Sequence, residues 1–189
     1  MFAFKGFNKN LECTMGKGVY KYEVGKWYKE ESAHCCRDGF HATDNPLDVL
    51  AYYNKPDDRY FIVELAGNVD EDAVNSRISA PEIKLVKEIS KAELYGKGVM
   101  WMINHPHAPN ANVVRKDKGD CCGDGYLVVR GMYPIAKGKK GDTLFLLKED
   151  CDGTIIEASC FVVGTDVKAN EFINIKGKKT NEKVGVVRA

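Results

Sequence analysis

Short strand-like runs bounded by turn residues recur along the chain, and they constrain its fold more than any other feature of the sequence. The clearest run, residues 59–67, is rich in β-branched and aromatic side chains. Gly-Lys, Asp-Gly and Gly-Thr-Asp turns separate four later apolar runs. These runs lie at residues 126–129, 143–147, 155–163 and 172–175. We therefore expect a β-dominated fold whose C-terminal part is an antiparallel β-meander.

Two segments carry helix signals. Asn45 precedes Pro46, which is typical of a helix N-terminus because the Asn oxygen caps free amides and proline pre-sets φ. We expect that short helix to end at Pro56. Ser90 followed by Glu93 resembles a capping box and predicts a second helix that begins there. Together with the strands, these helices indicate the α+β class.

The composition is that of an ordinary soluble globular protein of 189 residues. Lys and Arg total 28 against 27 Asp and Glu, a net charge of +1, whereas a protein that coats nucleic acid phosphates is usually far more basic. No run approaches the roughly 18 apolar residues of a membrane helix, and the start lacks a signal-peptide pattern. We expect a cytosolic protein with lobes at residues 1–95 and 96–189, either separate or sharing one core.

The cysteines and histidines form the first group of candidate chemical residues. The chain has seven cysteines, with His34-Cys35-Cys36 close to His41 and with Cys121-Cys122 after two further histidines. These residue types suit zinc, but adjacent side chains in an extended chain point to opposite sides, so the spacing is wrong. We predict reduced thiols and no metal. A zinc site, or a nucleophilic cysteine among these residues, is the alternative.

A pattern in the first 90 residues carries a family resemblance. It consists of Phe4-Lys5-Gly6 on an early strand, the element Gly-Phe-His-Ala-Thr-Asp at residues 39–44, and a late strand that opens with Pro81-Glu82. This order resembles the arginine–serine–glutamate class of ADP-ribosyltransferases. The resemblance implies a transferase-like split β-sandwich that binds NAD.

Carried over by residue, the resemblance places Lys5 at the family's arginine, Ala42 at its first serine, Thr43 at its threonine and Glu82 at its glutamate. It implies that Glu82 is catalytic and that Lys5, His41 and Thr43 bind the cofactor. Lysine lacks the planar fork of arginine, and Ala42 lacks a hydroxyl. We therefore expect these residues to line one pocket in which turnover of NAD is weak or absent.

A second resemblance rests on longer motifs. They include Cys-x-x-Gly-Phe-His-Ala at residues 36–42 and Asn-Pro-Leu-Asp-Val-Leu-x-Tyr-Tyr at residues 45–53. In these motifs the chain is similar to a family of uncharacterised proteins of bacteriophages and prophages of Gram-positive bacteria. That resemblance implies a viral origin and a location in the host bacterial cytoplasm.

Two functions follow as hypotheses. In the first, the protein is a phage-encoded accessory protein that binds a host or host-defence protein, without catalysis, cofactor or membrane. In the alternative, it is an NAD-dependent mono-ADP-ribosyltransferase that modifies a host protein or a nucleic acid. The sequence leaves the partner, a role for nucleic acid and the oligomeric state open.

Overall fold

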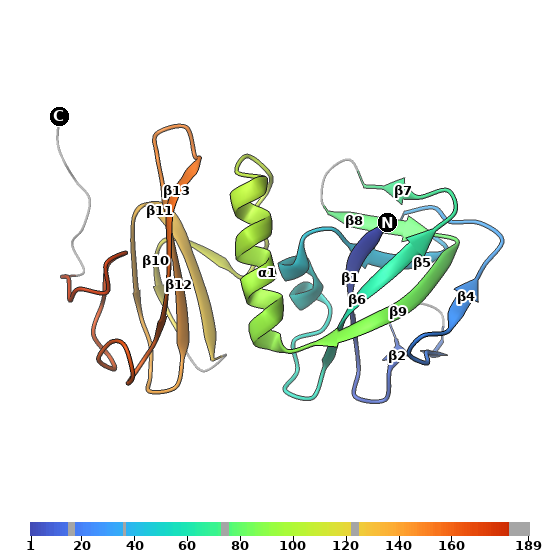
Figure 1. The fold of residues 1–189 in the computed structure, drawn as a ribbon, viewed down its shortest axis with the longest axis horizontal. Coiled ribbons are helices and arrows are strands. Elements are labelled where there is room, and N and C mark those ends of the chain that lie inside the picture. The colour runs from blue at the N-terminus through green and yellow to red at the C-terminus, as the bar shows by residue number, and fades with distance from the viewer. Residues whose placement is uncertain (15–17, 36, 73–75, 122–124, 182–189) are drawn as a thin grey trace. The chain divides into compact units, whose positions relative to one another are not determined.

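The structure is a computed structural model, which describes residues 1–14, 18–35, 37–72, 76–121 and 125–181. Strands hold far more of these residues than helices do (Figure 1). The expected β-dominated α+β fold is thereby confirmed. Among the helices of these segments, none has the length and the apolar character that crossing a membrane requires.

Two compact units make up the chain. Unit 1 is Met1–Trp101 and unit 2 is Met102–Ala189. The division falls inside helix α1 (Lys91–Asn104), a few residues beyond the boundary that the sequence places after residue 95. Each unit contains a hydrophobic core of its own.

Unit 1 is built on an antiparallel sheet with the strand order β4-β9-β6-β1-β5-β8-β7. Its strands are β1 (Phe2–Phe7), β4 (Trp27–Lys29), β5 (Phe40–Thr43), β6 (Arg59–Ala66), β7 (Asp70–Glu71), β8 (Arg77–Ala80) and β9 (Glu82–Ile89). A separate pair joins β2 (Glu12–Cys13) to β3 (Tyr20–Lys21). The strands expected at residues 2–7 and 59–67 are thus confirmed as β1 and β6.

β1 lies between β5 and β6, in the middle of the sheet, and is buried along most of its length. Ala3 and Phe7 are fully buried, and Lys5 lies between them on the same face because side chains alternate along a strand. On the opposite face, Gly6 meets Tyr53. A Cβ on Gly6 would lie 2.7 Å from the Cβ of Tyr53, so only glycine allows the two segments to approach this closely.

The helix expected after Asn45 is a 3₁₀ helix, η1 (Pro46–Ala51). Asn45 caps it as expected, since its side-chain oxygen accepts a hydrogen bond from the Leu47 N–H at 3.1 Å. The helix ends before Pro56 because the chain turns at Tyr52 to bring Tyr53 against β1.

The second expected helix is α1, and its capping box is confirmed. Ser90 Oγ accepts a hydrogen bond from the Glu93 N–H at 3.1 Å, and Glu93 Oε2 accepts one from the Ser90 N–H at 2.8 Å. Farther along α1, Trp101 Nε1 donates to Asp44 Oδ2 at 2.6 Å. These contacts attach α1 to the segment that follows β5.

Unit 2 contains a four-stranded sheet in the order β10-β11-β12-β13. The strands are β10 (Val114–Asp120), β11 (Tyr126–Lys137), β12 (Thr143–Glu149) and β13 (Ile155–Val162). The sequential order of a meander is present, but the pairs β10–β11 and β11–β12 are parallel and only β12–β13 is antiparallel. The expected antiparallel meander is therefore wrong for two of its three pairings.

The offset of the parallel pairing changes within β10, from fourteen residues at Val114 to seventeen at Lys118. Lys118 pairs with Ile135 and Tyr126 pairs with Thr143, in each case with a residue seventeen positions later. β10 breaks at Asp117, whose φ is 59°, and β11 bulges opposite that break. These irregularities interrupt the regular pairing of the two strands.

The fourth expected strand of unit 2, residues 172–175, is not a strand. Within it Ile173 makes only isolated bridges, to Ala136 and Lys179. The fourth strand is β10, which lies before the four apolar runs from which the sequence predicts strands.

Candidate functional site

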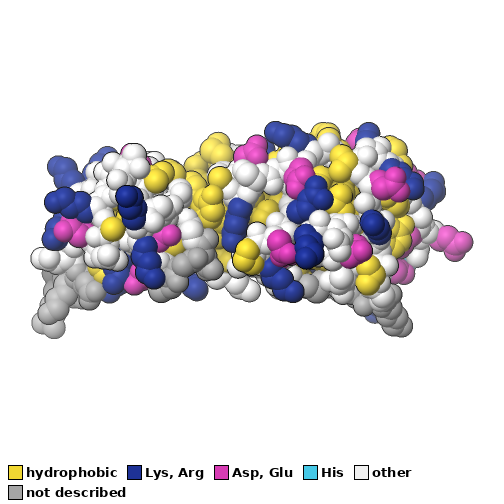
Figure 2. All heavy atoms as spheres, turned by 90° about the horizontal axis from the view of Figure 1, so that it is seen from below, with side chains coloured by type: hydrophobic (Ala, Val, Ile, Leu, Met, Phe, Trp, Pro, Cys, Tyr) yellow, Lys and Arg dark blue, Asp and Glu magenta, His cyan; other side chains and the backbone are white. Residues whose placement is uncertain are grey.

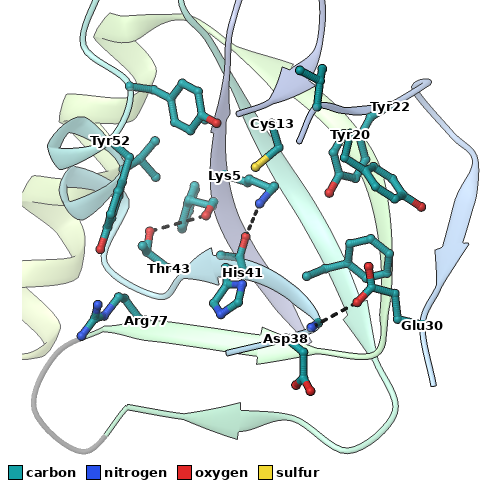
Figure 3. Close-up of a pocket in the computed structure, with 18 of the residues that line it drawn as sticks. Lys5, Cys13, Tyr20, Tyr22, Glu30, Asp38, His41, Thr43, Tyr52 and Arg77 are labelled. Atoms are coloured by element: carbon teal, nitrogen blue, oxygen red, sulfur yellow. Dashed lines mark hydrogen bonds between the residues drawn. The ribbon is translucent and has the colours of Figure 1, made fainter. Parts of the chain in front are cut away.

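A cavity of about 590 Å³ lies in unit 1, and residues of the neighbouring strands β1 and β5 line it (Figure 3). η1, the β2–β3 pair and β8 also contribute lining residues. In Figure 3, Tyr52 and Arg77 lie on one side of the cavity. Tyr20 and Tyr22 lie on the other, with Lys5 between the two groups. We call this cavity the β1–β5 pocket.

Lys5 is the most deeply buried charged residue of the β1–β5 pocket, with 7% of its surface exposed. Its Nζ donates a hydrogen bond to the backbone oxygen of His41. The same Nζ lies 5.7 Å from the ring centroid of Phe7 and 6.0 Å from that of Tyr22. Burial lowers the pKa of Lys5 below its ordinary value, and the nearby Cys13 thiol partly opposes this.

His41 comes from β5, where it pairs with Ser79 of β8. Burial lowers the pKa of His41, and the positive charge of Lys5 lowers it further. Both causes favour the neutral imidazole near pH 7. Arg77, farther along β8, also borders the pocket and acts on the pKa of His41 in the same direction.

Thr43 ends β5 with its hydroxyl turned toward the backbone. Its Oγ1 donates to the Asn45 oxygen at 2.9 Å and lies 3.4 Å from the Phe4 oxygen. The hydroxyl hydrogen is thereby used within the fold, although the oxygen can still accept a hydrogen bond. This geometry positions the start of η1 as well as the pocket wall.

Aromatic rings form much of the pocket wall. Tyr20 and Tyr22 have ring centroids 4.9 Å apart, and Phe40 lies 5.6 Å from Tyr20 and 6.2 Å from Tyr22. Burial raises the pKa values of Tyr22 and Tyr53. The phenols are therefore neutral at physiological pH and present flat, uncharged faces.

The two acidic side chains of the lining are already hydrogen-bonded to neighbouring protein groups. Glu30 Oε2 accepts from the Gly39 N–H at 3.1 Å. Asp38 Oδ1 lies 2.8 Å from His34 Nδ1, and this hydrogen bond lowers the pKa of Asp38. Both carboxylates are thus held in the wall, and neither is recorded as hydrogen-bonded to Lys5 in the described part of the chain.

Arg77 is held differently from Lys5. Its Nε and Nη2 donate to Asp72 Oδ2 at 3.1 Å and 2.6 Å. This ion pair fixes the guanidinium at the edge of the pocket. The buried Lys5 is on β1 and Arg77 is on β8, the two strands that flank β5. Positive charge therefore comes to the cavity from both neighbours of β5.

The structure brings together three of the four site residues that the sequence singles out. Lys5, His41 and Thr43 line the β1–β5 pocket, whereas Glu82 is not among its lining residues. Glu82 opens β9 and forms an ion pair with Lys29 of β4 at 2.7 Å. The expectation that Glu82 shares the pocket is wrong, because β6 and β1 separate β9 from β5 in the sheet.

The strand beside β5 is β8, and its contribution went unpredicted. Arg77 reaches the pocket from β8, and Cys13 reaches it from β2. Neither residue has a local sequence signal for a binding site. Tyr52 and Tyr53 do lie in a motif that the sequence singles out, but only as part of a helix and a family resemblance.

The candidate metal residues do not gather in the described parts of the chain, where no group of three or more His, Cys, Asp or Glu side chains could hold a metal ion. Cys36 and Cys122, one from each adjacent pair, lie outside those parts. Cys35 makes a 3.8 Å contact from its thiol to the Arg77 oxygen.

On the face seen in Figure 2, cationic and anionic side chains are intermingled.

Comparison with known proteins gives one match. The sequence model of DUF7666, a domain of unknown function, matches residues 1–97. No curated protein and no solved structure matches the chain. The matched region is more than half of the chain and includes every residue that lines the β1–β5 pocket.

Proposed function

The chain belongs to the DUF7666 family of domains of unknown function, and we propose that its unit 1 is a binding module that captures a small anionic aromatic molecule, of the nucleotide class, without catalysis. The ligand would occupy the β1–β5 pocket. Its volume of about 590 Å³ falls in the range of small-molecule sites, which is roughly 300–1,000 Å³.

Lys5 is the observation that carries this proposal. Burying a lysine costs free energy unless a partner stabilises its charge, and here the recorded hydrogen bond is to a neutral backbone oxygen. An anionic group beside Nζ would offset that cost. A phosphate is well suited, because charge-assisted hydrogen bonds to it are strong.

The aromatic wall accounts for the rest of the ligand. Tyr20, Tyr22 and Tyr52 line the pocket with neutral rings that can stack on a nucleobase. Tyr20 and Tyr52 are both about 40% exposed, so their faces are accessible from solvent. An aromatic surface beside a buried cation is complementary to a flat base joined to a phosphate.

The absence of catalysis is proposed from the arrangement of the carboxylates. A glycosyl-transfer reaction needs a carboxylate beside the cation that forms. Glu82 is paired with Lys29 on another strand, and Glu30 and Asp38 hold hydrogen bonds to the pocket wall. Capture of a ligand needs none of these groups.

Isothermal titration calorimetry with AMP, and with adenosine as the uncharged control, tests the proposal. We expect AMP to bind more tightly than adenosine. Lys5→Met should weaken AMP binding roughly tenfold or more, because hydrogen bonds to charged groups contribute about 1.5–3 kcal/mol. Lys84→Met is the matched control, since Lys84 also lies over an aromatic ring but outside the pocket. Equal affinities for AMP and adenosine, unchanged in Lys5→Met, would contradict the proposal.

A second candidate is the mono-ADP-ribosyltransferase. It is favoured by one observation: Lys5 and His41 lie on paired strands and line one cavity, as a transferase-like split β-sandwich requires. Release of nicotinamide from NAD is the direct assay. Release that disappears in Lys5→Met would support the transferase, and the noncatalytic proposal predicts none in either protein.

The proposal also narrows the expected biological role. The viral resemblance implies an accessory protein in a bacterial cytoplasm. The host component that such a protein captures would then be a nucleotide bound in unit 1, in place of a host protein. Native mass spectrometry of the chain purified from bacteria, before and after denaturation, would detect a retained nucleotide.

A further inference from the structure

The amine of Lys5 has the surroundings of a nucleophile. We propose that Lys5 forms an imine with an aldehyde group on an anionic aromatic ligand, so that the β1–β5 pocket holds such a ligand covalently and reversibly. The inference rests on the function proposed above, because it requires that this pocket is the ligand site. It adds a reactive group and a chemical class of ligand to that site.

Geometry is the first support for this inference. Lys5 lines the cavity, and its Nζ lies beside two aromatic rings, 5.7 Å from the centroid of Phe7 and 6.0 Å from that of Tyr22. One N–H is directed to the His41 oxygen, which orients the amine without occupying its lone pair. A lone pair that faces a partly apolar cavity is available to attack a carbonyl carbon.

The second support is the protonation state of the amine. Only the neutral amine is nucleophilic, and a lysine desolvated in an apolar pocket is the usual way in which proteins obtain it. Burial lowers the pKa of Lys5, and only the negative charge of a Cys13 thiolate would oppose this. No carboxylate is recorded in hydrogen-bond or ion-pair contact with Lys5 Nζ within the described segments, so none holds the proton there.

Lys84 provides the contrast. Its Nζ lies 5.6 Å from the ring centroid of Trp27, which resembles the setting of Lys5. Its side chain is 32% exposed, however, and Glu64 Oε2 lies 3.9 Å from Nζ. Lys84 therefore lacks the burial that distinguishes Lys5, and we do not expect it to react ahead of Lys5.

The proposed step balances without any further reactant. The Lys5 lone pair forms a bond to the aldehyde carbon, and the π-electron pair of the carbonyl moves to its oxygen. One hydrogen of the amine passes to that oxygen to give a carbinolamine. The C–O bond then breaks, the second amine hydrogen leaves with the oxygen as water, and the C=N bond of the imine remains.

The rest of the ligand follows from the pocket wall. A ring attached to the aldehyde would stack on Tyr20 or Tyr52, and an anionic substituent would be favoured by the positive charge of Arg77, which borders the cavity from β8. Pyridoxal 5′-phosphate has all three features and is a suitable probe. Pyridoxine 5′-phosphate, which carries an alcohol in place of the aldehyde, is the matched compound that cannot form an imine.

The experiment combines the two compounds. The full-length chain is treated with substoichiometric pyridoxal 5′-phosphate at neutral pH, and borohydride then reduces any imine to a stable secondary amine. Intact mass and peptide mapping locate the label. We expect the label on Lys5 in the wild type, its loss in Lys5→Met, and its retention on Lys5 in Lys84→Met. Calorimetry with pyridoxine 5′-phosphate separately reports noncovalent binding.

The outcomes separate this inference from the function on which it rests. Labelling of Lys5 ahead of the exposed lysines supports the imine, and mapping of the wild type gives this result even if Lys5→Met does not fold. Binding of pyridoxine 5′-phosphate with label only on exposed lysines overturns the imine and leaves the binding function standing. Failure of both compounds to bind the pocket overturns both.

Discussion

The amine of Lys5 is hydrogen-bonded to the backbone oxygen of His41, so the two residues lie close together. The pKa of His41 is lowered first by burial and then by the charge of Lys5. Removal of the Lys5 charge should therefore be felt at the His41 imidazole. This coupling can be measured at single residues.

The first prediction concerns the titration of His41. Lys5→Met should raise the pKa of His41, because it removes the second largest cause of the lowering. The imidazole resonances in an NMR pH titration report this directly. Lys84→Met should leave the titration unchanged, and an unchanged His41 pKa in Lys5→Met would show that the two groups are not coupled.

The same shift has a consequence for stability. The pKa of His41 is lower in the folded chain than its ordinary value of 6.5, so the unfolded chain binds more protons between these two values. Stability should therefore fall as the pH drops from about 6.5 toward the folded pKa, and this part of the fall should be absent in His41→Gln. Denaturant melts of both proteins across this pH range provide the measurement.

Phe40 and His41 are neighbours with opposite environments, and this gives a third prediction at the residue scale. Phe40 is 2% exposed and packs against Tyr20 and Tyr22, whereas His41 is only half-buried. Phe40→Ala should cost about 3–5 kcal/mol of unfolding free energy through the cavity that it leaves. His41→Ala should cost much less. Chemical denaturation of the two variants decides, and a larger loss in His41→Ala would contradict this burial pattern.

At the scale of elements, α1 contains a matched pair of glycines. A Cβ on Gly98 would lie 2.3 Å from Leu47 Cγ, whereas a Cβ on Gly96 would meet nothing within 4 Å. Gly98 thus permits the contact between α1 and η1, and Gly96 has no packing role of this kind. The sequence shows both glycines but does not distinguish them.

The pair yields opposite predictions for one substitution. Gly96→Ala should stabilise the chain by up to about 1 kcal/mol, because alanine is the better helix former. Gly98→Ala should destabilise it by about 1–3 kcal/mol through overpacking against Leu47. Thermal or denaturant melts of both variants test this, and a stabilising Gly98→Ala would mean that Leu47 moves aside without cost.

Local signals account for the elements that the sequence predicts correctly. β1 and β6 have apolar strand patterns, and the Ser90–Glu93 box marks the start of α1. β10 was missed because its sequence, Val-Arg-Lys-Asp-Lys-Gly-Asp, is polar and mostly exposed. The parallel pairing in unit 2 depends on bulges and an offset between distant residues, which no local pattern encodes.

The same contrast explains the candidate site: local sequence patterns reveal some of its residues, and others depend on which distant strands pair. Lys5, His41 and Thr43 could be singled out because a family resemblance rests on short contiguous motifs that contain them. The misplacement of Glu82 and the omission of Arg77 have one cause, the order of strands in the sheet. That order puts β8 next to β5 and leaves β9 beside β4 and β6.

At the scale of the whole molecule, the two units differ in what they contain. The residues that line the β1–β5 pocket all belong to unit 1, and the family match ends at residue 97. Each unit has a separate hydrophobic core. The ligand binding that we propose would therefore be a property of unit 1, and none of the described residues of unit 2 lines the pocket.

The last prediction follows from this division. A fragment of residues 1–104, which ends with α1, should bind AMP with the affinity of the full chain, because it keeps every residue that lines the pocket. Circular dichroism establishes that the fragment is folded, and calorimetry compares its affinity with that of the full chain. Lys5→Met in the fragment should reproduce the loss expected in the full chain. A folded fragment that does not bind AMP, beside a full chain that does, would mean that unit 2 contributes to ligand binding after all.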